Sequence, residues 1–121
     1  MLIAASVLTV LIAAAHSYLG ERYILVRLFR QSLPKLFGSD HFTRQTLRFA
    51  WHLTSVTWIG IAALFILLHF ELATQTNILY ILGTTFSVSA LVSLIASRGK
   101  HLSWLVFGSV AALCFGYTIV A

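Results

Sequence analysis

The stretch RFAWHLTSVTWIG, Arg48 to Gly60, marks the place where a basic part of the chain passes into an apolar one. From Phe49 to Phe70 the sequence contains no Asp, Glu, Lys or Arg. A helix needs about 20 mostly apolar residues to cross the roughly 30 Å hydrocarbon core of a bilayer, and this run is long enough. The stretch therefore predicts a membrane-spanning helix that carries a histidine, His52, past its basic entry point.

Three other segments of the chain are also free of charged residues and long enough to span a bilayer. Overall, 60% of the 121 residues are apolar and 9% are charged, whereas about 25% charged residues are usual in soluble domains. We therefore predict an all-α integral membrane protein, with one domain over residues 1–121 and four transmembrane helices in an up-down bundle. The expected spans are about 1–20, 49–70, 78–97 and 101–121, and the first helix is expected to extend into the basic connection 21–48.

The eight basic residues are confined to the two connections that follow the first and third spans. With four spans, both connections lie on one side of the membrane, and Lys and Arg accumulate in cytoplasmic loops. The pattern predicts that both termini lie on the non-cytoplasmic side of the plasma or inner membrane. Arg48 lies directly before the second span. The other seven are expected to contact anionic lipid headgroups, with no nucleic-acid partner: Arg22, Arg27, Arg30, Lys35, Arg44, Arg98 and Lys100.

Three histidines enter the expected spans near the basic side. Residues three, four and seven positions apart share one face of a helix, so Arg48, His52 and Ser55 form one polar stripe. His16 lies near the end of the first span and His101 begins the fourth, which places both at a depth similar to that of His52. The sequence therefore predicts a polar pocket near the cytoplasmic face, with the following candidate residues: His16, Glu21, Arg48, His52, Ser55 and His101.

Small residues accompany the first and last of these histidines. His101 shares a helix face with Gly108, Ala112 and Gly116. Small residues let transmembrane helices approach closely and mark packed faces. We therefore expect the histidines to point into the bundle. Glu21, the acidic residue nearest to them in the sequence, is expected to pair with an arginine.

Three interpretations of the histidines remain open. They could bond to hydroxyls, such as those of the third span, and fix helix packing. They could line a site that binds or conducts a proton, an ion or a small anion, since imidazole changes charge near neutral pH. They could also hold a divalent metal, with His16, His52 and His101 as ligands, or a haem b between two of the three.

The pattern His-x-x-x-x-x-Trp-x-Gly, His52 to Gly60, resembles the histidine helix of small haem-binding membrane proteins such as the bacterial membrane protoporphyrinogen oxidases. The resemblance covers nine residues, and it implies haem ligation by His52.

The function expected first is a small membrane protein that binds or conducts a proton, ion or small anion at this pocket. A haem- or metal-binding redox or enzyme subunit is the alternative, and an accessory subunit of a larger membrane complex is a third. No nucleotide-binding, nucleophile or paired-cysteine motif is present, so catalysis is not the favoured interpretation. Four short helices enclose little space, so we expect a homo-oligomer or a larger membrane complex.

Overall fold

The computed structural model describes all residues from 1 to 121, and its secondary structure is helical, without strands. The first helix is continuous over three segments: α1 (Leu2–Leu19), a π-helical turn η1 (Gly20–Leu25) and α2 (Val26–Leu28). It is followed by α3 (His41–His69), α4 (Gln75–Ser97) and α5 (Ser103–Val120). The combined helix Leu2–Leu28 and the three that follow are each long and apolar enough to cross a membrane. The predicted all-α fold with four such helices is confirmed, as is the extension of the first helix beyond residue 20.

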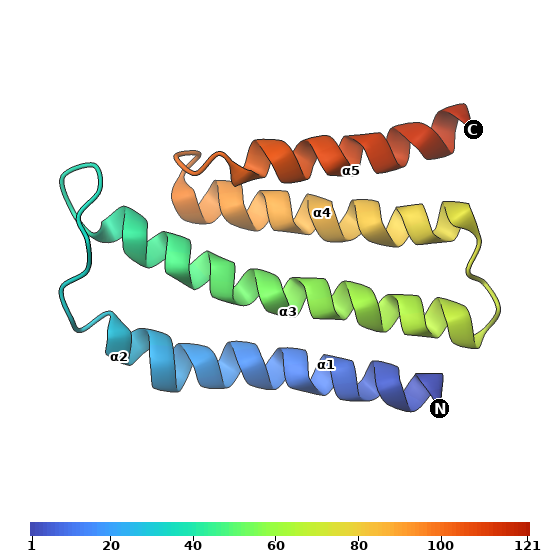
Figure 1. The fold of residues 1–121 in the computed structure, drawn as a ribbon, viewed down its shortest axis with the longest axis horizontal. Helices are drawn as coiled ribbons and strands as arrows, with labels where there is room; N and C mark the ends of the chain where they lie inside the picture. Colours follow the sequence, from blue (N-terminus) through green and yellow to red (C-terminus); the bar gives the residue numbers. More distant parts are fainter.

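The helices run up and down in sequence order, but they form a single open layer (Figure 1). The first helix packs on α3, α3 on α4, and α4 on α5, and no other pair of these helices comes close together. The helices thus alternate in direction as predicted for an up-down bundle, but they pack in a row and not around a common core. The physical reason is the kind of residue in the seams: most buried side chains are Ala or Ser, which join two neighbouring backbones but cannot fill a common core. Only 12 of 121 residues are buried, so both faces of the layer are uncovered.

The helix that contains the expected span 49–70, α3, begins at His41 and so extends beyond that span toward the basic connection. Its first two turns project Arg44 and Arg48 from a regular helix. Asp40 occupies the N-cap position of α3, but its side chain accepts no capping hydrogen bond and pairs with Arg44 instead. The start of α4, by contrast, has a side-chain cap, because the Thr74 hydroxyl accepts the N–H of Asn77.

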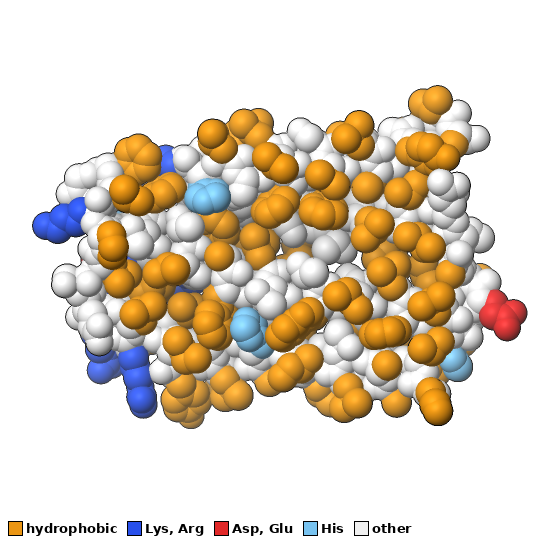
Figure 2. All heavy atoms as spheres, in the orientation of Figure 1, with side chains coloured by type: hydrophobic (Ala, Val, Ile, Leu, Met, Phe, Trp, Pro, Cys, Tyr) orange, Lys and Arg blue, Asp and Glu red, His pale blue; other side chains and the backbone are white.

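The connection 29–40 is tied to the start of α3. The Arg44 guanidinium donates to the carbonyls of Phe29 and Gln31, and the Thr43 hydroxyl donates to the carbonyl of Pro34 at 2.7 Å. These bonds fold the connection over the end of the layer where the α4–α5 turn also lies (Figure 1). We call this the basic end, since every Lys and Arg lies at or near it. Figure 2 shows the exposed basic side chains there, while the chain termini and Glu71 lie at the opposite end.

Candidate functional site

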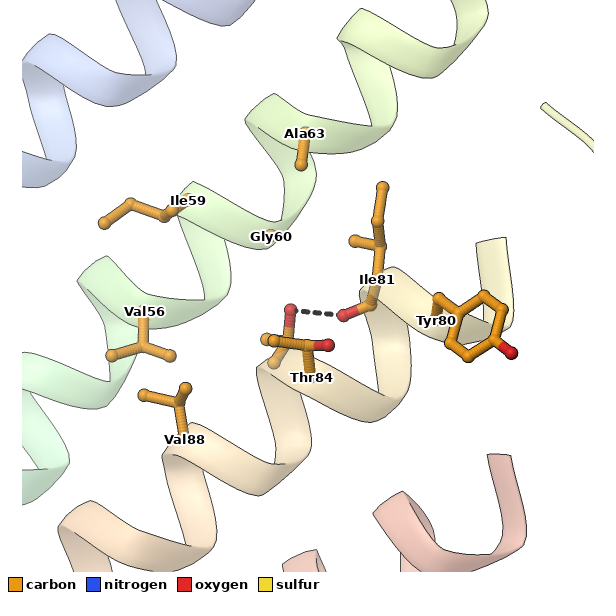
Figure 3. Close-up of a pocket in the computed structure, with 9 residues that line it drawn as sticks. Val56, Ile59, Gly60, Ala63, Tyr80, Ile81, Thr84 and Val88 are labelled. Atoms are coloured by element: carbon orange, nitrogen blue, oxygen red, sulfur yellow. Dashed lines mark hydrogen bonds between the residues drawn. The ribbon is translucent and has the colours of Figure 1, made fainter. Parts of the chain in front are cut away.

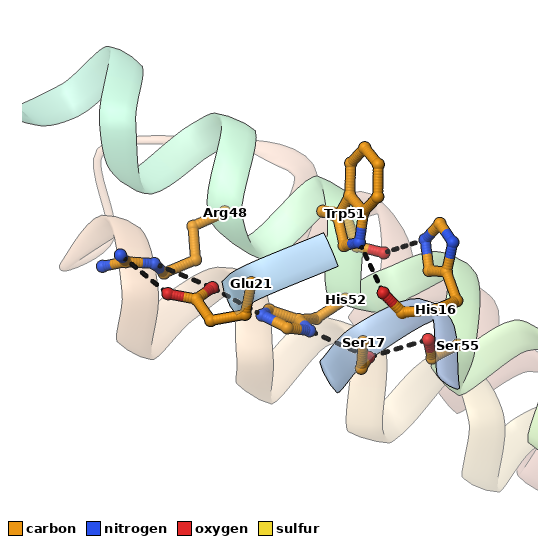
Figure 4. Close-up of polar contacts among 7 residues, drawn as sticks. All are labelled: His16, Ser17, Glu21, Arg48, Trp51, His52 and Ser55. Carbon is orange, nitrogen blue, oxygen red and sulfur yellow. Dashed lines mark hydrogen bonds and ion pairs between the residues drawn. The ribbon is translucent and has the colours of Figure 1, made fainter. Parts of the chain in front are cut away.

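A chain of polar side chains lies in the seam between the first helix and α3, close to the basic end (Figure 4). The outermost link is an ion pair between Arg48 and Glu21, with 2.9 Å between Arg48 Nη2 and Glu21 Oε1. The Nε2 of His52 lies 3.2 Å from Glu21 Oε2. These three side chains are each about one third exposed (39%, 33% and 32%), so they lie at the edge of the seam. The predicted pairing of Glu21 with an arginine is confirmed.

The polar chain continues from His52 toward the middle of the layer. The Nδ1 of His52 lies 2.9 Å from the hydroxyl of Ser17. Ser17 donates to Ser55 at 2.8 Å, and Ser55, which is buried, donates to the carbonyl of Ala13 at 2.9 Å. We refer to Arg48, Glu21, His52, Ser17 and Ser55 as the seam network. It links α3 to the first helix through four side-chain contacts in a row.

The number of hydrogens on the two serines fixes which atom of each contact donates. A hydroxyl has one hydrogen, and a carbonyl oxygen only accepts, so the hydrogen of Ser55 points at Ala13. The oxygen of Ser55 then accepts from Ser17, which uses the single hydrogen of Ser17. The oxygen of Ser17 can therefore only accept from His52. It follows that Nδ1 of His52 carries a hydrogen.

The other ring nitrogen of His52 faces a carboxylate, which accepts but does not donate when ionised. For this contact to be a hydrogen bond, one further proton is needed, as on Nε2 of an imidazolium next to an ionised Glu21. The same number of protons is kept if Glu21 is protonated and donates to a neutral imidazole. If this proton leaves, one contact loses its hydrogen: either that of Nε2 with Glu21, or, when the hydroxyl of Ser17 turns toward Nδ1, that of Ser17 with Ser55. Every contact of the seam network is a hydrogen bond only when His52 and Glu21 together carry one proton more than a neutral imidazole and an ionised carboxylate do.

A glycine and a tryptophan bring the two helices of this seam together. Gly20 is buried, and an added Cβ would overlap the indole of Trp51, whose Cζ2 would lie at 2.6 Å. The indole Nε1–H donates to the carbonyl of His16 at 3.0 Å. The π-helical turn begins at Gly20 and contains Glu21, and such turns occur frequently at functional sites. Close approach at Gly20 thus brings Glu21 to α3.

His16 lies on the other side of Trp51 and does not join the seam network. Its ring stacks on Trp51, with centroids 4.5 Å apart, and meets the edge of Trp58 at 5.0 Å. Its Nε2 lies 3.3 Å from the backbone carbonyl of Trp51. The role of His16 in this structure is to fix the packing of α1 on α3.

His101 is separate from the other two histidines. Its Nδ1 lies 2.8 Å from the hydroxyl of Ser103, and its ring packs against Phe49 and Phe42. The single layer explains the separation, because two helices, α3 and α4, lie between α1 and α5. A similar position along neighbouring helices does not bring side chains together across an open layer.

The structure therefore does not bring His16, His52 and His101 together as a set of metal ligands. No group of three or more His, Cys, Asp or Glu side chains is close enough together to hold a metal ion. Both ring nitrogens of His52 are engaged, by Ser17 and Glu21, so haem ligation by His52 would have to displace one of these contacts. The small residues on the His101 face are not packed in this chain: a Cβ added at Gly108 or Gly116 would meet no atom within 4 Å.

Sequence reasoning missed Ser17 and Trp51. Ser17 precedes Glu21 by four residues, so the two share a face of the first helix, and this spacing could have identified it. Trp51 has no such signal, because its role depends on the absence of a side chain at Gly20. The hydroxyls of the third span are possible partners for the histidines by sequence, but those of Thr85 and Ser89 donate to carbonyls of their own helix.

An apolar hollow lies between α3 and α4, away from the seam network (Figure 3). It has a volume of about 360 Å³, and its walls include Val56, Ile59, Tyr80 and Val88. The hydroxyl of Thr85, which also lines the hollow, donates to the carbonyl of Ile81 at 2.8 Å. This surface can accept an acyl chain or an apolar side chain, and it offers no acid–base chemistry like that of the seam network.

Comparisons of this chain with protein-family models, curated proteins and solved structures found no match. The nine-residue resemblance at His52 to Gly60 thus has no support from the remainder of the chain.

Proposed function

We propose that this chain is an integral membrane protein that binds one proton reversibly at its seam network, between two transmembrane helices. The observation that carries this proposal is the order of donors from His52 through Ser17 and Ser55 to the carbonyl of Ala13. That order requires a hydrogen on Nδ1 of His52, and we place the further proton of the His52–Glu21 contact on Nε2. A neutral imidazole gives up one of these hydrogen bonds, each of which contributes about 0.5–1.5 kcal/mol.

The proposal places the basic end at the cytoplasmic face of the plasma or inner membrane, with both termini outside. The confinement of all Lys and Arg to one end supports this orientation. Arg48 and Glu21 then lie at the interface, and His52 lies one helical turn deeper, about 6 Å along α3. Protons would enter and leave from the cytoplasmic side.

Proton conduction by a single chain is not part of the proposal. The hydrogen-bonded chain ends at the carbonyl of Ala13. Farther along the same seam, the hydroxyl of Ser6 donates to the carbonyl of Ala62, and no side-chain hydrogen bond joins this pair to Ser55. The seam network therefore suits a site that is loaded and unloaded from one side. A path across the membrane would need helices from another chain.

The direct test is histidine nitrogen NMR on the protein in lipid nanodiscs. We expect both nitrogens of His52 to be protonated in the native chain. In Ser55→Ala the hydrogen of Ser17 is free to bond to Nδ1 of a neutral imidazole, so a singly protonated His52 should appear in the spectrum under the same conditions. Ser89→Ala is the matched control, because Ser89 is equally buried and bonds only to the carbonyl of Thr85. A singly protonated His52 that does not respond to Ser55→Ala would reject the proposal.

A second candidate function, an accessory subunit of a larger membrane complex or a homo-oligomer, is favoured by the open layer. Gly60 and Thr85 meet in the middle of the α3–α4 seam, and they line hollows of about 360 Å³ and about 230 Å³ that involve different sides of α3. Hollows on an uncovered helix layer suit the side chains of neighbouring helices. The test is native mass spectrometry after mild solubilisation: a species that is only monomeric at every detergent concentration would argue against this function.

A further inference from the structure

A small polar cavity lies at the basic end, where three segments of the chain meet. These are the turn at residues 36–39, the first two turns of α3 and the α4–α5 turn. The volume of about 70 Å³ is several times the 10–15 Å³ that one water molecule needs. The polar residues on its walls are Ser39, His41, Gln45, Ser97, Arg98 and Lys100.

The charge of this cavity is positive and not neutralised. Arg98 and Lys100 are exposed and form no ion pair, and no acidic residue lines the cavity. The two acidic residues elsewhere at the basic end are already engaged, Asp40 with Arg44 and Glu21 with Arg48. The ammonium of Lys100 lies 5.5 Å from the ring centre of Phe37, which keeps it beside the loop. An anion entering the cavity therefore meets two cations without competition from a carboxylate.

Neutral groups around the cavity are also suited to an anion. The side chains of His41 and Gln45 make no hydrogen bond within the protein, so their N–H groups are available. The last carbonyls of α4, which would repel an anion, accept backbone N–H groups of Arg98, Gly99 and Lys100. The cavity also adjoins the N-terminus of the 29-residue helix α3, whose partial positive charge favours anions.

We propose that this cavity is a binding site for a phosphate group, supplied by the headgroup of an anionic phospholipid. A tetrahedral phosphate can accept hydrogen bonds from several directions at once, which matches cations and amides that come from three separate segments. The position of the cavity, at the ends of two helices of spanning length, is the level at which lipid headgroups lie. The site is independent of the seam network, and it differs from general attraction because it assigns the contact to Arg98 and Lys100 among the eight basic residues.

The experiment compares two double variants in nanodiscs that contain phosphatidylcholine with a minority of phosphatidic acid. Arg98→Asn with Lys100→Gln removes both cavity cations, and asparagine suits the left-handed backbone of residue 98 (φ 51°). Arg22→Gln with Arg27→Gln removes the same charge from exposed positions elsewhere at the basic end. Phosphatidic acid that remains bound to the protein after detergent extraction is counted by native mass spectrometry.

We expect the cavity variant to retain at least tenfold less phosphatidic acid than the native chain, and the control variant to retain a native amount. Equal losses in the two variants would overturn the proposal, since they would show that only net charge matters. A second arm titrates inorganic phosphate into nanodiscs of pure phosphatidylcholine. Binding there that the cavity variant abolishes would support the phosphate site and identify free phosphate as its source. Full lipid retention by the cavity variant would also overturn the proposal. Circular dichroism of both variants checks that the helices are intact.

Discussion

The substitution Gly20→Ala tests whether the seam between the first helix and α3 depends on backbone contact with Trp51. The backbone of Gly20 is ordinary right-handed helix (φ −62°, ψ −47°), so alanine is compatible with it. On helix propensity alone, alanine would stabilise the protein by about 0.8–1 kcal/mol. The new Cβ would, however, overlap the Trp51 indole, with 2.6 Å to Cζ2 where about 3.5–4.0 Å is optimal.

The expected net effect of Gly20→Ala is destabilisation by about 2 kcal/mol. Overpacking of a well-filled site costs about 1–3 kcal/mol. Displacing the indole also breaks its hydrogen bond to the carbonyl of His16, which is worth about 0.5–1.5 kcal/mol, and disturbs the stacking of His16 on Trp51. The helix-propensity gain offsets only part of this sum.

The assay is unfolding in mixed micelles by increasing SDS, followed by helical circular dichroism. Two comparisons isolate the cause. In a Trp51→Leu background, the shorter side chain does not reach Gly20, so Gly20→Ala should become neutral or stabilising. Gly108→Ala is the matched control, since a Cβ there meets nothing within 4 Å and should stabilise the helix. If Gly20→Ala destabilises equally with and without Trp51, the inferred contact does not set the position of the first helix.

Three further outcomes are expected. Ser93→Ala removes a buried hydroxyl that bonds to Ser103 and should destabilise α4–α5 packing by about 1–2 kcal/mol in the same SDS assay. The Arg44 hydrogen bond holds the pKa of Asp40 below its ordinary value of 3.8, so this carboxylate supports the connection above that pH and loses its effect as pH falls through the lowered value. Hydrogen exchange in residues 29–40 should accelerate there, and Asp40→Asn should abolish the pH dependence. A membrane-impermeant amine reagent should label Lys100 only in permeabilised cells, and labelling of intact cells would reverse the proposed orientation.

The number of apolar helices and the separation of charge could be predicted from the sequence, because each depends on composition along one segment. Twenty apolar residues predict a spanning helix whatever surrounds them. The stripe of Arg48, His52 and Ser55 was also predictable, because it lies on a single helix. All three face the first helix, as their common spacing implied.

The lateral order of the helices could not be predicted in this way. It depends on which small residues on one helix meet which side chains on another, as Gly20 meets Trp51 and Gly60 meets Thr85. Sequence periodicity shows which helix faces carry small residues, but not which of these faces pack against a neighbouring helix. The ladder that includes Gly108 shows the difference: its pattern is that of a packed face, yet no neighbour covers it in this chain.

The same open layer explains why the seam network stands out among the polar groups of the spanning helices. A helix with two uncovered faces leaves its hydroxyls near lipid, where an unpaired polar group is costly. Most of them are satisfied within their own helix: Thr57, Thr85 and Ser109 each donate to the carbonyl four residues earlier. Such bonds need no partner helix and no charge. The chain from Glu21 to Ala13 is different, because it passes between helices and its last acceptor fixes every donor back to His52. A packing role alone would be served by neutral groups, whereas under the proposed function the contact between His52 and Glu21 completes this order with one further proton.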